Sequence, residues 1–390
     1  MRPGSGGQMI LFPYAGDTRG GSVHSSFLLI DELLRRGRPL LLAFHGEGFA
    51  RDSAIKRGFP HIDLGALGTR AEADRKDRFR LGNVSALIAC RRAIVEHGAT
   101  VVHVNDKRML RTWCIPARMS SAALLTHWRG MYLPRGRSVD LGLRLTSRII
   151  CVSSYTHHLL PAWARGKSEV VYNPFKPILD AGQRDDARRR IRESAGIPAD
   201  AAVIGFFGSL LNRKRPHMLL DILRRLKTTA DGRPVWGILC GEIQEPRDEV
   251  YFRTVEAEDW RGRLVAAGYV DNIGEWMAAS DVMIAPGIEE PFGRVGIEAQ
   301  SVGLPVVVSS DAGLREVVED GISGLVVDPD DFEAWVDSVR RVLDDVKLAR
   351  KLSEEGQHAA ARLTVASHAD AIEAIYKRVL GFRSLSDVSA

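Results

Sequence analysis

Two glutamates, Glu290 and Glu298, lie eight residues apart in the stretch EPFGRVGIE, where two carboxylates could flank one anionic ligand. The apolar run before them predicts a buried strand that ends at Ala285, and a loop containing Pro and Gly separates it from a helix expected between Gly293 and Gly303. The first turn of such a helix has N–H groups without intrahelical partners and carries the positive end of the helix dipole. This arrangement is typical of a diphosphate site.

The residues of this turn could hold different parts of one ligand. Glycine at position 293 lets a phosphate approach the N–H groups of Gly293, Arg294 and Val295. Glu298, about one and a half turns into the helix, can accept hydrogen bonds from the vicinal hydroxyls of a ribose. Glu290, on the other side of the phosphates, could hold hydroxyls of a sugar. The alternative is structural, since acidic residues near a helix N-terminus or on a solvated face need no ligand.

Alternating strands and helices must position this segment. The expected strands of the first half are MILFPY (9–14), PLLLAFH (39–45), 100–104, 122–126 and 149–152, with helices such as 22–36 and 84–96 between them. The second half repeats the pattern with VIGFFG, VWGILCG, RLVAAGY, DVMIAP, PVVVSS and GLVVD, and with helices expected at 184–195, 216–228, 332–345 and 369–380. Such alternation predicts βαβ units, and therefore two Rossmann-like domains with buried parallel sheets.

The two prolines of VVYNPFKP mark the expected passage between the domains. We expect an N-terminal domain of residues 1–175 that binds an acceptor, a C-terminal domain of 176–365 that binds the phosphorylated ligand, and a last helix, about 366–390, that packs back onto the first domain. Because ligands of open α/β sheets bind beyond the carboxyl ends of the strands, we expect the domains to face each other across a deep cleft.

The charge of the chain is divided unequally. Residues 1–175 contain 26 Lys and Arg against 13 Asp and Glu, whereas residues 176–390 contain 28 against 36. A basic half attracts phosphates, anionic glycans or acidic lipid headgroups. A solvated, arginine-rich surface explains the same excess equally well.

Other features of the sequence exclude several classes of protein. The four cysteines (Cys90, Cys114, Cys151, Cys240) have no CxxC or Cys/His spacing, which disfavours a disulfide framework and a zinc site. The apolar runs are too short for a membrane span, and residues 1–16 lack the features of a secretory signal. We expect a cytoplasmic protein, with a peripheral position at the inner face of the membrane left open, and no nucleic-acid partner.

The segment from Glu290 onward resembles the retaining glycosyltransferase family 4, also called glycosyl transferases group 1, which has the GT-B fold. The family pattern is EPFG, including Phe292, then an apolar-EA helix, G-x-PVV and a small-residue turn, and the likeness continues through DAGLREVVEDGISGLVVDP. It covers residues 200–330 closely. The resemblance implies a UDP- or GDP-sugar donor, transfer with retention of anomeric configuration, and neither a metal nor another cofactor.

Within GFFGSLLNRKRP (205–216), the resemblance places Lys214 where such enzymes contact the donor diphosphate. The family often has Arg directly after the glycine, but this chain has Ser209. Arg213 or Arg294 could replace the missing cation, because a guanidinium binds phosphate bidentately. Tyr269 and Val270, after Gly268, lie where these enzymes contact the nucleotide base.

In the N-terminal half, the resemblance covers single positions. Gly20 and Gly21 match the turn that approaches the donor phosphates, and Asn173 matches an asparagine near the hinge. His127, at the end of an expected strand, matches a cleft-facing histidine that could bind the O6 atom of the donor sugar, although a strand-end histidine is often structural. Arg129 is a weaker candidate for binding an acidic acceptor.

The resemblance assigns catalysis to Glu290, His127 and Lys214, with the leaving phosphate accepting the proton of the acceptor. Helix dipoles and Lys214 would neutralise the diphosphate without a metal. One alternative is a sugar-nucleotide-binding protein without catalysis, motivated by Ser209. Another is an NAD oxidoreductase, which the lack of GxGxxG after a strand disfavours.

The acceptor is expected to be a glycan or a lipid-linked molecule, as in bacterial polysaccharide assembly. The stretch 106–119, DKRMLRTWCIPARM, mixes basic residues with Met109, Leu110 and Trp113, as segments at an anionic membrane surface do. Core packing explains those apolar residues equally well.

Overall fold

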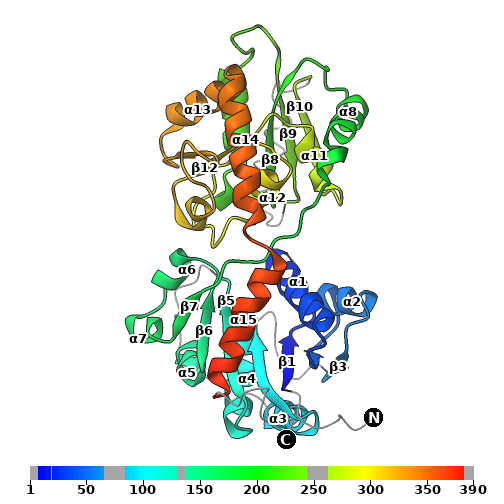
Figure 1. Ribbon diagram of the computed structural model, residues 1–390, viewed down its shortest axis with the longest axis vertical. Coiled ribbons are helices and arrows are strands. Elements are labelled where there is room, and N and C mark those ends of the chain that lie inside the picture. The colour runs from blue at the N-terminus through cyan, green and yellow to red at the C-terminus, as the bar shows by residue number, and fades with distance from the viewer. Residues whose placement is uncertain (1–7, 19, 66–83, 131–136, 244–261, 382–390) are drawn as a thin grey trace, which may run out of the picture. The chain divides into compact units, whose positions relative to one another are not determined.

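Short runs of buried apolar residues form parallel strands in both halves of the chain, as Figure 1 shows for the computed structural model. The structure describes residues 8–18, 20–65, 84–130, 137–243 and 262–381. The chain divides into an N-terminal unit, Met1–Pro174 with Thr364–Ala390, and a C-terminal unit, Phe175–Leu363. These limits lie one or two residues from the boundaries expected at 175/176 and 365/366.

The N-terminal unit contains a seven-stranded parallel sheet in the order β3-β2-β1-β4-β5-β6-β7. The order reverses direction between β1 and β4, as in a doubly wound fold. Its strands are β1 (Met9–Tyr14), β2 (Leu40–Phe44), β3 (His61–Asp63), β4 (Ala99–Val104), β5 (Ala123–Trp128), β6 (Arg148–Cys151) and β7 (Ser168–Val170).

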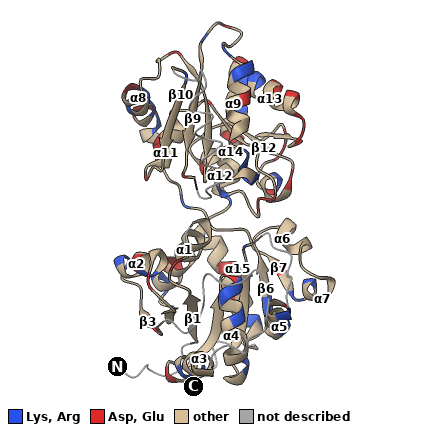
Figure 2. Ribbon diagram, turned by 180° about the vertical axis from the view of Figure 1, so that it is seen from behind, with Lys and Arg blue, Asp and Glu red and all other residues tan. Residues whose placement is uncertain are grey.

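Helices cover both faces of this sheet, which is why its strands are apolar on both sides. One face packs on α1 (Gly21–Arg35) and on the last helix, α15 (Val365–Val379), which contact each other. The other face packs on α3 (Val84–Glu96), α4 (Lys107–Met119) and α5 (Arg137–Leu145). The shorter helices are α2 (Phe49–Lys56), α6 (Ser154–His158) and α7 (Ala162–Arg165). Figure 2 marks the positions of Lys and Arg on α5 and α15 in blue.

The C-terminal unit contains a six-stranded parallel sheet in the order β10-β9-β8-β11-β12-β13. Its strands are β8 (Ala202–Phe207), β9 (Val235–Cys240), β10 (Leu264–Gly268), β11 (Val282–Ala285), β12 (Val306–Ser309) and β13 (Leu325–Val327). Its helices include α8 (Arg184–Ser194), α9 (His217–Arg225), α11 (Ile273–Ala278), α12 (Arg294–Ser301), α13 (Phe332–Asp344) and α14 (Val346–Ala361). The order reverses between β8 and β11, so the loops after these two strands meet at the switch point, the usual ligand position in such sheets.

Helix α14 and strand β5 are among the elements that differ from the sequence predictions. Helix α14 was not predicted; it begins at the cap Asp345, and its Gly356 permits close contact, because a Cβ atom there would lie 3.2 Å from the side chain of Gln300 in α12. Strand β5 was expected to end at residue 126, but pairing with β6 continues it to Trp128. His127, opposite Ile150, is therefore the second-to-last residue of the strand, so it lies at the strand end as expected.

Three apolar residues of 106–119, those singled out in the sequence, belong to the core. Met109, Leu110 and Trp113 are fully buried in α4, among the side chains between that helix and the sheet. The reading of these three residues as a membrane-surface segment was therefore wrong. None of the described helices is long and apolar enough to cross a bilayer.

The packing of α15 predicts a localised effect of mutation. Ile372 is completely buried in the core of the N-terminal unit, so Ile372→Ala should lower the free energy of unfolding by about 2–5 kcal/mol. Hydrogen exchange should accelerate in β1 and β4 more than in β8 and β9. The control Val346→Ala, at a residue that is 70% exposed, should change stability by less than about 0.5 kcal/mol. Faster exchange confined to the C-terminal unit would contradict the assignment of α15.

Candidate functional site

The loop after β11 leads into α12 through a glycine that the local geometry requires. Gly293, the N-cap of α12, has a φ of 82°, and a Cβ atom there would lie 2.5 Å from the Leu314 side chain. Helix α12 starts at Arg294, so its first amides precede the regular intrahelical pairing, and the Gly296 amide donates instead to the Gly293 carbonyl at 3.0 Å. The structure thus forms the turn for which the sequence predicted an anion site.

Glu290 is the centre of an ion-pair cluster beside this turn. Its Oε2 atom lies 2.9 Å from Nη1 of Arg213 and 3.4 Å from Nζ of Lys214. Burial alone would raise the pKa of Glu290, but Lys214 and Arg213 outweigh it and hold that pKa below its usual value. The carboxylate is therefore ionised and tied to two cations at neutral pH.

Backbone contacts bring the loop after β11 against the loop after β8. The Ile288 amide donates to the carbonyl of Arg213 at 2.8 Å, and a Cβ atom on Gly287 would lie 3.4 Å from Cα of Lys214. On the other side, the Gly313 amide donates to the Glu290 carbonyl at 2.8 Å. Glu290 is thus fixed between two neighbouring segments.

Glu298 is paired within α12. Its Oε1 atom accepts a hydrogen bond from Nη2 of Arg294, one turn earlier, at 2.7 Å. The Glu298 side chain keeps 15% of its surface exposed. The carboxylate that we expect to accept hydrogen bonds from a ribose is therefore present, and it is paired with Arg294. The ribose hydroxyls would either share this carboxylate with Arg294 or displace Arg294 from it.

Apolar side chains line a pocket next to Glu290 and Lys214. It is formed by Phe206, Phe207, Lys214, Ile284, Ala285, Gly287, Glu290, Val295 and Leu314. Its charged groups, Lys214 and Glu290, share the pocket lining with apolar residues at the ends of β8 and β11. A site of this kind, mostly apolar with few converging polar groups, is typical of small-molecule binding.

Backbone strain is concentrated around this pocket. Of the four non-glycine residues with positive φ in the described chain, three are Arg215 (53°), Glu289 (53°) and Ala312 (58°), all in loops around the site. Such conformations cost energy and persist where surrounding contacts enforce them, commonly at functional sites. Here the Glu289 amide is held by the carboxylate of Asp311.

Tyr269 and Ser209 lie in the loops at the same end of the sheet. Tyr269 follows β10 and is 66% exposed, and a hydrogen bond from its hydroxyl to Asp271 raises its pKa. Ser209 directly follows Gly208, whose amide donates to the Cys240 carbonyl at 2.9 Å. Val270 is half-buried. The structure thus keeps Tyr269 available for contact, and its role toward a base stays a prediction.

Residues 187–359 match the family described as glycosyl transferases group 1, a span that contains Lys214, Glu290 and Glu298. The match lies within the C-terminal unit and confirms the family resemblance drawn from EPFG and the residues that follow it.

Curated relatives match about half of the chain or less. The D-inositol 3-phosphate glycosyltransferase of Corynebacterium urealyticum is 30% identical over 196 residues, which is 49% of this chain and 46% of that protein. The enzyme of the same name from a Nocardioides species is 33% identical over 183 residues, 43% of this chain and 40% of the relative. The chain thus matches less than half the length of these relatives.

Solved structures extend the likeness to both units. Anabaena HepE in complex with UDP has a TM-score of 0.79 at 19% identity, covering 95% of this chain and all of that one. A glycosyltransferase from Rickettsia africae has a TM-score of 0.81 at 19% identity, covering 97% and 100%. The fold is therefore GT-B, with two Rossmann-like units, as the sequence predicted.

The N-terminal unit holds the remaining predicted residues. Gly20 is the N-cap of α1, with a φ of 90°, and Gly21 is the first residue of that helix. They form the expected turn after β1, and their contact with a donor stays a prediction. This turn lies at the switch point between β1 and β4.

His127 lies in a column of buried rings. It stacks between His103 of β4 and His368 of α15, with ring centroids 5.5 and 5.8 Å away, and it is 1% exposed. Its Nδ1 atom lies 3.1 Å from Nη2 of Arg129, while its buried Nε2 atom has no partner among the described residues. The expected contact with a donor sugar is untested, and the observed partners of His127 are structural.

Arg129 fastens the segment that ends the N-terminal unit. Its guanidinium donates to the side-chain oxygens of Asn105, at 3.2 Å, and of Asn173. His368 fastens the same segment through the Tyr172 carbonyl, 2.7 Å from its Nδ1 atom. The side chains of Asn105, Asn173 and His127 therefore already contact Arg129. An acceptor that binds Arg129 would have to share this guanidinium with them. Sequence reasoning missed His103 and His368, because only the fold brings them to His127.

The buried histidines predict a loss of stability in acid. Burial, followed by the charge of Arg129, lowers the pKa of His368 to about 3 and holds those of His103 and His127 well below 6.5. A proton then binds the unfolded chain more strongly, so this stability is complete above about pH 6.5 and is lost as the pH falls toward the folded pKa. Each such histidine should contribute about 1.4 kcal/mol of lost stability per pH unit in that window.

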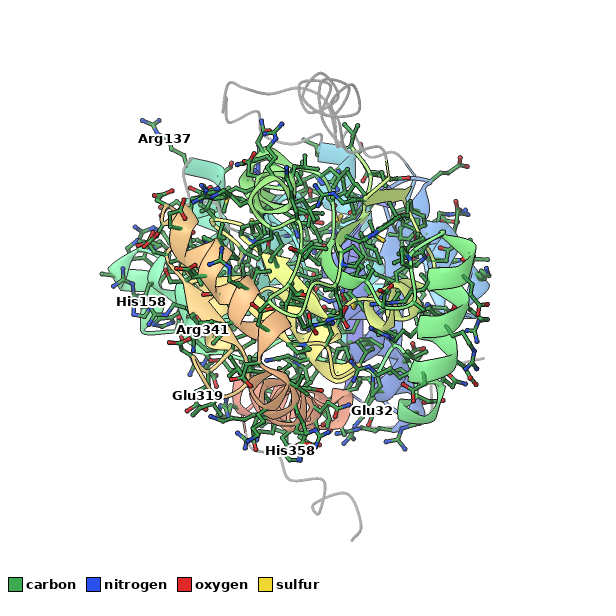
Figure 3. The ribbon with its side chains drawn as sticks, turned by 90° about the horizontal axis from the view of Figure 1, so that it is seen from above. Glu32, Arg137, His158, Glu319, Arg341 and His358 are labelled. Carbon is green, nitrogen blue, oxygen red and sulfur yellow. The ribbon has the colours of Figure 1, made fainter. Side chains whose placement is uncertain are left out.

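Urea unfolding between pH 7 and pH 5 measures this dependence. The variant His368→Asn should show a smaller slope than the unmodified protein. The matched control His358→Asn removes a histidine whose side chain is 71% exposed and which lies at the surface in Figure 3, so its slope should be unchanged. An equal slope for His368→Asn and the unmodified protein would show that His368 does not remain neutral.

Proposed function

We propose that this protein is a retaining, metal-independent glycosyltransferase of family 4 that moves a sugar from a UDP- or GDP-sugar to a glycan or lipid-linked acceptor. The observation that carries the proposal is the placement of Glu290, Lys214 and Glu298 around the first turn of α12 at the switch point of the C-terminal sheet. The HepE structures that hold UDP and UDP-glucose support a nucleotide-sugar donor.

The geometry supports a separate role for each group. The amides of the first turn of α12 and the ammonium of Lys214 would bind the diphosphate, where negative charge grows as the sugar leaves. Glu298 would accept hydrogen bonds from the ribose hydroxyls, and Glu290 would hold hydroxyls of the transferred sugar. The amides of α12 and the ammonium of Lys214 would together stabilise the negative charge of the leaving diphosphate, so we expect no metal requirement.

The transfer step balances without a protein nucleophile. The bond between the anomeric carbon and the diphosphate oxygen breaks while the acceptor oxygen attacks from the same face of the sugar. The acceptor proton passes to the departing phosphate oxygen, so the products are the glycosylated acceptor and a nucleoside diphosphate. The configuration at the anomeric carbon is retained.

The acceptor is inferred from the charge of the N-terminal half. The family match spans residues 187–359, which contain the donor-site candidates Lys214, Glu290 and Glu298, and so it bears on the donor more than on the acceptor. The excess of Lys and Arg in residues 1–175 favours an anionic acceptor, such as a phosphorylated lipid carrier or an acidic glycan. We therefore keep polysaccharide or glycoconjugate assembly as the proposed role.

A second candidate is a protein that binds a sugar nucleotide without transferring the sugar. Ser209, which stands where the family often has an arginine, favours it. The two candidates differ in one product, because only a transferase releases free UDP or GDP in the presence of donor and acceptor.

Replacing Glu298 should weaken nucleotide binding in a selective way. In Glu298→Gln the charged acceptor for the ribose hydroxyls is lost, so the Kd for UDP or GDP should rise about 10-fold to 100-fold in calorimetric titration. The Kd for the 2′,3′-dideoxy nucleotide should change little, because that ligand has no vicinal hydroxyls. Glu319→Gln, at an exposed glutamate of the same unit labelled in Figure 3, is the control and should bind normally. Equal weakening for both nucleotides would argue against a ribose contact.

Removal of divalent metals should leave transfer intact. The rate of UDP or GDP release from donor and acceptor should be the same, within about twofold, before and after EDTA treatment, because helix amides and Lys214 supply the positive charge. A loss of activity that Mg²⁺ or Mn²⁺ restores would overturn the metal-independent mechanism. Nucleotide binding without release, with any donor and acceptor, would favour the non-catalytic candidate.

A further inference from the structure

Four basic residues are candidates for binding a diphosphate. Three follow β8 in the sequence, Arg213, Lys214 and Arg215, and the fourth, Arg294, begins α12. Their partners in the structure distinguish them. Nη1 of Arg215 lies 3.4 Å from Oδ1 of Asp330 and donates to the Pro329 carbonyl. Arg294 is paired with Glu298 at 2.7 Å. Only Arg213 and Lys214 among these four converge on Glu290.

The charge balance of this cluster requires both cations. Lys214 and Glu290 alone sum to zero, and Arg294 and Glu298 also sum to zero. Each phosphoryl group of a diphosphate carries negative charge, and more develops on the departing oxygen. With Arg213 included, the cluster of Arg213, Lys214 and Glu290 has a net charge of +1. Without Arg213, these side chains would have no excess positive charge to attract a diphosphate.

The position of Arg213 suits a second anionic partner. One nitrogen of its guanidinium, Nη1, contacts Glu290, while Nε and Nη2 have no hydrogen-bond partner among the described residues. The side chain is 30% exposed, compared with 20% for Lys214 and 16% for Glu290. A planar guanidinium held at one nitrogen and open at the others can bind a phosphate through the remaining N–H groups.

We infer that Arg213 is the second diphosphate-binding cation of this protein and takes the place of the arginine that Ser209 lacks. Arg294, the other candidate, serves instead to orient and neutralise Glu298. The inference rests on the proposed function, because it assigns a residue to the diphosphate subsite of that same donor site.

Positions 209 and 213 lie close enough to exchange this role. A Cβ atom on Gly208, next to Ser209, would lie 3.5 Å from Nζ of Lys214, so the ammonium group rests against the turn that carries Ser209. The Ser209 side chain is half-buried and small. An arginine introduced at 209 would therefore start beside the ammonium group that Arg213 now accompanies.

The test compares Arg213→Gln with the double variant Arg213→Gln/Ser209→Arg. Glutamine keeps a donor for Glu290, so that carboxylate stays hydrogen-bonded. Calorimetric titration with UDP, GDP, UMP and uridine should show the Kd of the preferred diphosphate rising about 10-fold to 100-fold in Arg213→Gln, with uridine affected less than about twofold. The double variant should recover most of the lost affinity. Arg224→Gln, which removes an exposed arginine paired with Asp221 in the same unit, is the matched control and should bind as the unmodified protein does.

The outcomes separate this inference from the proposed function. If the unmodified protein binds no nucleoside diphosphate, the proposed function fails, and the inference fails with it. If it binds one and Lys214→Ala weakens that binding but Arg213→Gln does not, the inference alone is overturned. Equal weakening for uridine and the diphosphate would also overturn it, because Arg213 would then act on the shape of the site and not on the phosphates.

Discussion

The C-terminal unit depends on one largely desolvated carboxylate, that of Glu290, and on the two cations that keep it ionised. A desolvated glutamate without a partner would cost several kcal/mol, so Glu290 requires Arg213 and Lys214 to stay where they are. In doing so it ties the loop after β11 to the loop after β8 across the switch point of the sheet. The strained backbone at Glu289 and Ala312 lies beside this cluster, where the Glu289 amide donates to the Asp311 carboxylate and the Gly313 amide donates to the Glu290 carbonyl.

The same cluster explains how a site can be formed before its ligand arrives. Glu290 neutralises part of the positive charge, and Arg294 neutralises Glu298, so neither carboxylate is buried without a partner. A diphosphate would bring negative charge to the cations, and sugar and ribose hydroxyls would bring donors to the carboxylates. Binding then exchanges one set of charge-assisted hydrogen bonds for another.

Local patterns in the sequence predicted much of this structure. Strand β1 and helix α3 have the predicted limits, and the helix after β11 starts within one residue of Gly293, because apolar runs and glycine turns act over short stretches. The column of His103, His127 and His368 could not be predicted, because α15 follows β5 by more than 230 residues. The pairing of Arg129 with Asn173 likewise depends on the complete fold.

The central claim is that the first turn of α12 binds the diphosphate of a sugar nucleotide. Hydrogen exchange of the amides of Gly293, Arg294 and Val295 tests it most directly, measured with and without a saturating UDP- or GDP-sugar. The account predicts that bound nucleotide sugar slows exchange at these three amides, because phosphate oxygens accept hydrogen bonds from them. Unchanged exchange at the turn, in a protein shown by calorimetry to have bound the nucleotide sugar, would contradict the account.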